Sequence, residues 1–190
     1  MNAGHDEEAA RAALYGLLGE LFYAPPGQPL LDAIVEAPAG GDGVLSDAWQ
    51  VLARACRTAE PGAIADEYES LFIGTGRPEL MLYGSFYLSG FMMEKPLAAL
   101  RTDLAALGLA RADSVAESED HIAALCHTMR HLAGQASLEV QKEFFSRHIA
   151  PWAATMCDAI AAHPQARFYP AVAQFAELFF DIEVQAFDMV

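Results

Sequence analysis

The sequence predicts an all-α fold, and two observations support that prediction. Apolar residues recur three or four positions apart along most of the chain, which is the spacing of amphipathic helices. Valine, isoleucine and threonine are sparse, and no alternating run is bounded by turn residues, so strands are not expected. Apolar residues make up 54% of the 190 residues and charged residues 19%, so we expect a folded chain that is rich in core.

The chain before residue 73 is expected to form four helices. The first ends at Pro25-Pro26, and one face of it carries five apolar residues: Leu14, Leu17, Leu18, Leu21 and Phe22. A short helix is expected over 29–36, and 37–43 is a loop by composition. Ser46 or Asp47 is expected to cap the third helix. Pro61-Gly62 precedes the fourth, whose apolar residues are Ile64, Tyr68, Leu71 and Phe72.

Residues 73–90, IGTGRPELMLYGSFYLSG, are rich in glycine and aromatic residues and show no clear period. We expect an irregular segment there, and long irregular segments inside compact domains are often functional. Helical spacing returns over 97–107, and Gly108 is expected to be the residue that ends this helix.

The connector 109–118 is predicted to be a hinge between an N-terminal lobe, 1–108, and a C-terminal lobe, 119–190. Ser118 is expected to cap the next helix, with Glu119 and Asp120 in its first turn. Further helices are expected from about residue 137, from Pro151 to Pro164, and over the last apolar stretch of the chain, which begins near Tyr169.

Charge excludes several classes of partner. The 26 acidic residues outnumber the 11 basic ones, so the net charge is −15. Such a surface repels phosphate backbones, so nucleic-acid binding is not expected, whereas a basic peptide would be attracted.

The three cysteines form no C-x-x-C pair, which indicates reduced thiols and a cytoplasmic location. The sequence also has no apolar run of the roughly 18 residues that span a bilayer, so no stable membrane insertion is expected.

A cluster of polar residues at 115–134, VAESEDHIAALCHTMRHLAG, admits more than one interpretation. His127 and His131 are four positions apart and share a helical face, where they could ligate a metal ion or lie in solvent. Asp120 and His121 could act as an acid–base pair, cap a helix, or bind a ligand. No nucleophile motif, phosphate-binding loop or H-E-x-x-H motif accompanies them, so no known motif supports a catalytic residue, a metal or a cofactor here.

Four blocks in the same order resemble the TorD/DmsD/NarJ-type chaperones, also called redox enzyme maturation proteins. They are YESLFIGTGRPELMLYGSFYL, ESEDHIAALCHTM, QKEFFSRHIAPW and, more weakly, LLGELFYAPP. One departure is Glu119, where the family usually has proline. The resemblance implies a TorD-like helical bundle of two lobes joined by a hinge, and no catalysis.

The resemblance also implies a role and a site. Such proteins bind the twin-arginine leader or the apoprotein of a molybdo- or tungsto-enzyme catalytic subunit, and hold it in the cytoplasm until its cofactor is inserted. Motif positions imply eight peptide-binding residues: Leu71, Phe72, Tyr83, Gly84, Ser85, Tyr87, Asp120 and His121. Four more motif residues are interpreted as scaffold: Gln141, Phe144, His148 and Trp152. A monomer or a dimer, including a domain-swapped one, is compatible with a hinged bundle.

Two alternatives remain beside this interpretation. One is a metal- or cofactor-dependent helical enzyme that uses His121, His127 and His131. The other is a helical adaptor protein. A twin-arginine leader is basic and then apolar, so an acidic surface would attract it, Asp120 would accept a hydrogen bond from an arginine, and His121, titrating near neutrality, would tune that contact.

Overall fold

The computed structural model describes residues 3–74, 76, 78–92, 94–112 and 115–189. Of the residues described, 71% are helical, and they form no strand, only one isolated β-bridge between Tyr83 and His121. The prediction of an all-α fold is therefore confirmed. Over the same residues, each helix is too short or too polar to cross a bilayer.

The chain forms two compact units, and each is assembled from separate stretches of sequence. Unit 1 comprises Met1–Tyr23, Leu82–Ala153 and Val184–Val190, and unit 2 comprises Ala24–Met81 and Ala154–Glu183. Both units thus contain segments from each of the predicted lobes. The connector 109–118 belongs to unit 1, and its residues Asp113 and Ser114 lie outside the described residues. Its role as a hinge stays a prediction.

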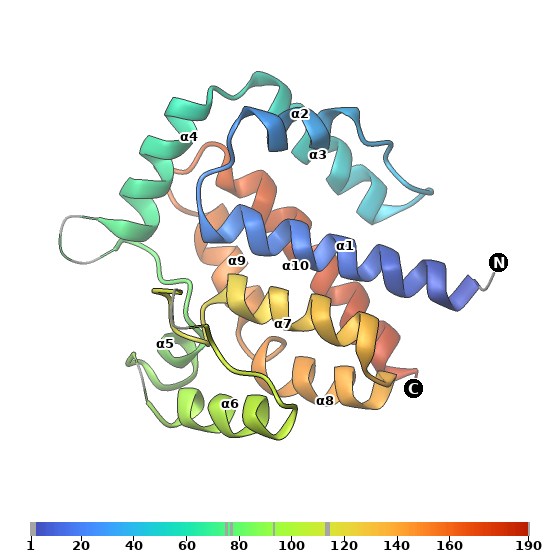
Figure 1. Cartoon of the computed structure of the whole chain (residues 1–190). Helices are drawn as coiled ribbons and strands as arrows, with labels where there is room; N and C mark the ends of the chain where they lie inside the picture. Colours follow the sequence, from blue (N-terminus) through green and yellow to red (C-terminus); the bar gives the residue numbers. More distant parts are fainter. Residues whose placement is uncertain (1–2, 75, 77, 93, 113–114, 190) are drawn as a thin grey trace. The chain divides into compact units, whose positions relative to one another are not determined.

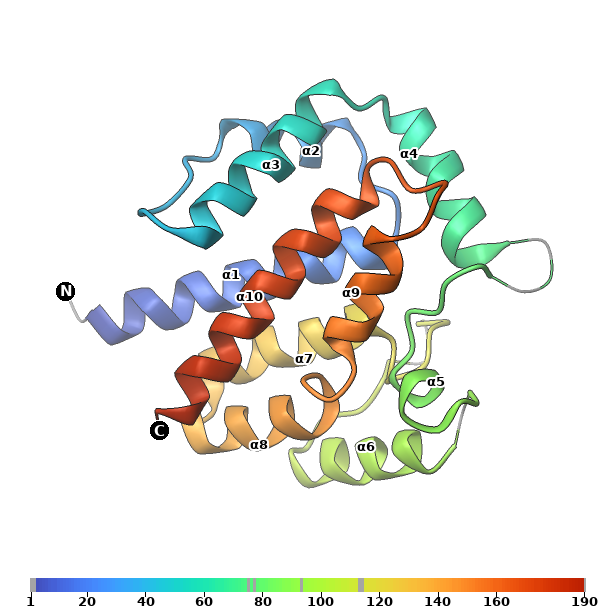
Figure 2. The same ribbon diagram turned by 180° about the vertical axis from the view of Figure 1, so that it is seen from behind.

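Unit 1 contains α1 (Ala3–Tyr23), α5 (Gly84–Ser89), α6 (Lys95–Ala106), α7 (Ile122–Gln135) and α8 (Leu138–His148). Helices α1 and α7 lie side by side, and α8 runs back beside α7 (Figures 1 and 2). Both helices bury apolar side chains: Tyr15, Leu18, Leu21 and Phe22 in α1, and Ile122, Leu125, Cys126, Met129 and Leu132 in α7.

Two glycines allow polar side chains of α7 to lie directly on α1. A Cβ at Gly19 would stand 2.8 Å from the His127 ring, and a Cβ at Gly16 would stand 3.0 Å from the Arg130 side chain. Real Cβ atoms are essentially never found at the first distance, so a larger residue at position 19 would require the His127 ring to move.

Helix α6 ends as the sequence predicts. Gly108 adopts a left-handed φ of 72°, its N–H donates to the Ala105 carbonyl, and the Leu109 N–H donates to the Leu104 carbonyl at 2.8 Å. This pair of bonds is a Schellman motif, in which glycine accepts the left-handed conformation without strain.

Unit 2 contains α2 (Gln28–Glu36), α3 (Val44–Thr58), α4 (Pro61–Tyr68), the π-helix η1 (Glu69–Ile73), most of α9 (Ala153–Ala161) and most of α10 (Tyr169–Asp188). Helices α2 and α3 are neighbours joined by a loop (Figure 1). The rings of Tyr68, Phe72 and Tyr169 pack edge to face or tilted, with centroids 4.9–5.8 Å apart. The Glu67 carboxylate accepts hydrogen bonds from the backbone N–H groups of residues 167–169 at the start of α10.

Three local predictions were wrong. Helix α3 begins after Gly43, ahead of Ser46 and Asp47, and neither of these caps it. Residues 84–89, expected to be irregular, form α5. Helix α7 is capped by His121 in place of Ser118, because the His121 Nδ1 accepts the Ala123 N–H at 3.1 Å. Glu119 and Asp120 therefore precede that helix.

Candidate functional site

The candidate site is built around a short antiparallel contact within unit 1. The Gly84 N–H donates to the Asp120 carbonyl at 2.9 Å, and the Ile122 N–H donates to the Leu82 carbonyl at 2.8 Å. These bonds form the bridge between Tyr83 and His121. The structure thereby brings together five of the eight predicted binding residues: Tyr83, Gly84, Ser85, Asp120 and His121.

Asp120 ties this contact to the start of α5. Its side chain is 3% exposed, and its Oδ2 accepts the Ser85 N–H at 2.9 Å while the Ser118 hydroxyl donates to its Oδ1. A carboxylate suits this place because the first N–H groups of a helix have no partner within the helix. Both oxygens of Asp120 thus have partners inside the chain, and the carboxylate holds α5 in position.

His121 is a neutral residue at neutral pH. Burial lowers its pKa from 6.5 to about 4, and the nearby Glu117 and Asp120 carboxylates only partly oppose this effect. Because its Nδ1 accepts the Ala123 N–H, the neutral ring carries its proton on Nε2. The expectation that His121 titrates near neutrality was wrong, since that expectation took no account of its burial.

Tyr83 connects the bridge to a second carboxylate. Its ring stands edge-on to His121 with centroids 5.0 Å apart, and its hydroxyl donates a hydrogen bond to Glu117. A glutamine side chain would accept the same hydrogen bond without carrying a charge. Glu117 therefore also places a negative charge beside the Tyr83 hydroxyl.

Gly84 lies against Trp152, which joins the site to the end of α8. A Cβ at Gly84 would stand 2.9 Å from the Trp152 Nε1, and this indole N–H donates to the His148 carbonyl at 2.7 Å. The Tyr87 ring stacks on Trp152 with centroids 5.4 Å apart and planes 17° apart. Glycine is therefore required at position 84 by the close approach of a fixed indole.

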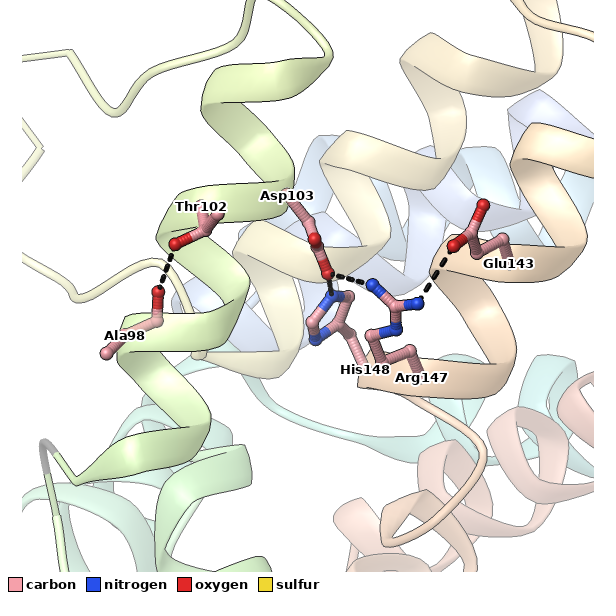
Figure 3. A network of polar contacts seen from close by, with 6 residues as sticks. All are labelled: Ala98, Thr102, Asp103, Glu143, Arg147 and His148. Carbon is pink, nitrogen blue, oxygen red and sulfur yellow. Dashed lines mark hydrogen bonds and ion pairs between the residues drawn. The ribbon is translucent and has the colours of Figure 1, made fainter.

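A polar network joins α6 to α8 (Figure 3). Asp103 accepts a hydrogen bond from Arg147 at 2.8 Å and lies 2.7 Å from the His148 Nε2, while Arg147 also bonds Glu143 at 2.8 Å. The bond from Arg147 is the main reason that the pKa of Asp103 is lowered. Burial lowers the pKa of His148 despite its bond to Asp103.

The scaffold interpretation of His148 and Trp152 agrees with this network. Gln141 is buried too, and its side chain bonds Arg11 at 2.9 Å and the Ala136 carbonyl at 3.0 Å. Phe144 is buried beside His148, with ring centroids 5.0 Å apart.

A pocket of about 490 Å³ lies beside the Tyr83–His121 bridge, within unit 1. One wall is the outer face of α7, with His121, Ala124, His127, Thr128 and His131. The remaining lining residues come from α1, from the end of α6 and from the segment that follows it: Tyr23, Leu104, Leu109, Ala110, Arg111, Ala112, Val115, Glu117 and Glu119. In volume and largely apolar lining it matches common ligand pockets.

The two glutamates of the pocket differ in their partners. Glu119 pairs with Arg101 at 2.9 Å and with Arg111 at 3.8 Å. Glu117 accepts the Tyr83 hydroxyl, and within the described part of the chain no arginine or lysine forms an ion pair with it. The glutamate at the position where the family usually has proline thus carries two ion pairs.

His127 and His131 are both exposed and border the pocket. Among the side chains that the structure describes, no group of three or more His, Cys, Asp or Glu residues is placed to hold a metal ion. The alternative of a metal-dependent enzyme gains no support from the geometry.

The other three predicted binding residues do not line the pocket. Leu71 and Phe72 are buried in unit 2, where Phe72 packs against Tyr68 and Tyr169. Tyr87 stacks on Trp152. Sequence reasoning did not single out Glu117 or the apolar wall of the pocket, because no motif marks them and only the fold brings them together.

Comparison with known proteins identifies the family of this chain. Residues 42–158, more than half of the chain, match the family model described as nitrate reductase delta subunit, and the chain belongs to this family, which includes TorD. The resemblance predicted from the four sequence blocks is confirmed.

Individual relatives agree with this assignment. The chain is 26% identical over 137 residues to the chaperone protein TorD of two Vibrio cholerae serotype O1 strains, ATCC 39541 and M66-2. Each alignment covers 66% of this chain and 62% of the relative, so the chain spans less than two thirds of the length of these relatives. A crystal structure from Archaeoglobus fulgidus, described as a redox enzyme maturation protein, has the same fold, with a TM-score of 0.62. That match is 18% identical and covers 90% of this chain and 92% of the other.

Proposed function

We propose that this chain is a cytoplasmic chaperone of redox enzyme maturation. In this proposal it binds the precursor of a molybdo- or tungsto-enzyme catalytic subunit, through the twin-arginine leader, the apoprotein or both. It keeps the precursor from export until the cofactor is inserted, and it catalyses no reaction itself. Family membership and the chaperone name of its relatives support this role.

The observation that carries the proposal is the pocket beside the Tyr83–His121 bridge. It is mostly apolar, it includes an acidic residue that no cation in the described chain neutralises, and it lies on a chain of net charge −15. A leader that is basic and then apolar matches both properties, because charge speeds its approach and burial of its apolar part stabilises the complex.

The predicted site residues divide into two roles in this proposal. His121 contacts the client, since it lines the pocket, and Tyr83 positions Glu117 through its hydroxyl. Asp120, Ser85 and Gly84 hold those two in place through the contacts already described. A binding role for Leu71, Phe72 and Tyr87 stays a prediction, as does the choice between monomer and dimer.

Affinity capture tests the function directly. The tagged chain is expressed in its native host during anaerobic growth, and the captured proteins are identified by mass spectrometry. We expect one molybdo- or tungsto-enzyme catalytic subunit, still carrying its leader, to dominate the captured proteins. We expect its capture to be lost when the leader is deleted, or when the region of the apoprotein that binds the chaperone is removed. A Tyr83→Ala/His121→Ala double variant, tagged in the same way, is the matched control bait. Equal recovery of unrelated proteins by both baits, with no redox enzyme precursor, would contradict the proposal.

A further inference from the structure

We propose that Glu117, held by the Tyr83 hydroxyl, is the subsite for an arginine side chain of the client, and that the apolar wall of the same pocket receives the apolar side chains beside that arginine. This inference rests on the proposed function, because the occupant is a segment of the client peptide. It assigns the pocket's polar and apolar parts to two successive parts of one ligand.

The charges around the pocket favour Glu117 over Glu119. Glu119 already has Arg101 and Arg111 as partners, and Arg111 also donates to the Val115 carbonyl. Glu117 has a neutral donor, the Tyr83 hydroxyl, and no cation of the described chain is paired with it. A guanidinium that enters the pocket would therefore find one carboxylate whose charge is not matched.

The surroundings of Glu117 prepare it for a planar cation. The Tyr83 hydroxyl fixes one carboxylate oxygen, and the partial burial of the glutamate reduces the loss of freedom when a ligand binds. Arginine binds a carboxylate through two parallel hydrogen bonds, a geometry that lysine does not reproduce. The neighbouring His121 ring adds no repulsion, since burial lowers its pKa to about 4.

The rest of the pocket suits apolar side chains. Leu104 is 7% exposed, and Leu109 and Ala124 are half-buried, so their surfaces still face the pocket. His127 contributes a ring that lies on α1 beside Gly19. The volume of about 490 Å³ falls within the range of about 300–1,000 Å³ for ligand pockets.

Peptide binding tests the arginine subsite. The probe is a synthetic 20-residue peptide with two consecutive arginines followed by a run of leucine and alanine, measured by fluorescence anisotropy at low and high salt. We expect Glu117→Gln to weaken binding about tenfold and to reduce the salt dependence. Glu7→Gln, an exposed residue of α1, makes the same change in net charge and is expected to bind like the wild type.

A second peptide isolates the contact itself. When both arginines are replaced by glutamine, we expect the wild type and Glu117→Gln to bind equally, because the partner of Glu117 is gone. An equal loss in Glu117→Gln and Glu7→Gln, or a tenfold difference that persists with the glutamine peptide, would overturn the assignment.

The apolar wall has its own matched pair. Ala124→Phe fills the pocket from α7 and is expected to weaken binding of both peptides at least tenfold, whereas Ala99→Phe, at an exposed position of α6, is expected to leave binding unchanged. If Ala124→Phe does not unfold cooperatively, Thr128→Leu on the same wall replaces it. Unchanged binding by the folded variant would refute the apolar half of the assignment.

Capture of a precursor and binding of the peptide distinguish the arginine subsite from the chaperone function. If the wild type captures a redox enzyme precursor and Glu117→Gln captures as much, the subsite is wrong and the chaperone function stands. If the wild type neither captures such a precursor nor binds the arginine peptide, both are wrong.

Discussion

Substitution of Gly84 by alanine tests whether close packing on Trp152 holds the candidate site together. The new Cβ would lie 2.9 Å from the Trp152 Nε1, so the indole or the start of α5 must move. The indole is not free to move without loss, because its N–H donates to the buried His148 carbonyl at 2.7 Å and its ring stacks on Tyr87.

The expected cost follows from these contacts. Overpacking of a fixed core contact destabilises by about 1–3 kcal/mol, and loss of the indole hydrogen bond adds about 1 kcal/mol. Restriction of the unfolded chain by alanine offsets about 0.4–1 kcal/mol of this. We therefore expect Gly84→Ala to lower the free energy of unfolding by about 1–3 kcal/mol.

Urea denaturation followed by circular dichroism measures this change. Gly134→Ala in α7 is the matched control, because a Cβ there meets no atom within 4 Å, and it should stabilise the chain by about 0.5–1 kcal/mol. The reasoning is refuted if Gly84→Ala is as stable as Gly134→Ala, since the indole would then yield without cost.

Three further changes test other contacts. Asp120→Ala leaves the buried Ser85 N–H without its acceptor and should lower the free energy of unfolding by about 1–3 kcal/mol in urea titrations. Glu67→Ala removes the acceptor of the backbone N–H groups of residues 167–169 and should cost about 1–2 kcal/mol by the same measurement. His121→Asn keeps a cap at the start of α7 but removes a group whose pKa falls from 6.5 to about 4 on folding. Between pH 6.5 and pH 4 the wild type should therefore lose about 3 kcal/mol of stability, and the variant should not.

Each of these changes has a control and a contrary result. Asp120→Asn keeps one acceptor oxygen and should cost less than Asp120→Ala; equal costs would mean that the Ser85 bond contributes little. Asp66→Ala removes an exposed acid from the same helix as Glu67, and equal stability of the two variants would contradict the capping role. For His121, the unfolded chain takes up a proton that the folded chain refuses, so stability must fall as the pH falls. Parallel pH profiles for the wild type and His121→Asn would refute this, and the exposed His131→Asn is the control.

Local sequence signals predicted the helical fold well. The apolar spacing of α1 and of α6 depends on residues close together in the chain, and so does the Schellman motif at Gly108. Prolines and glycines likewise indicated where most helices end. These signals need no knowledge of tertiary contacts, because a helix is formed by bonds between neighbouring turns.

The missed features depend on partners distant in sequence. Helix α5 is short and owes its start to the carboxylate of Asp120, which no local pattern around residue 84 reveals. The low pKa of His121 comes from burial, and burial is a property of the packed fold. Glu117 gains its position from Tyr83 in the same way. The motif resemblance indicated five residues that the fold does bring together, although it could not separate those that hold the site from those that face the pocket.

The interleaved order of the two units constrains how this chain can be made and divided. The chain passes from one unit to the other at residues 23–24, 81–82, 153–154 and 183–184. During synthesis, unit 1 is complete only once Val184 and the residues after it have been made, long after α1 has left the ribosome. No single cut releases an intact unit, and a truncated fragment of either would lack part of its own core. Experiments on the candidate site therefore need the whole chain, and single substitutions will be more informative than fragments.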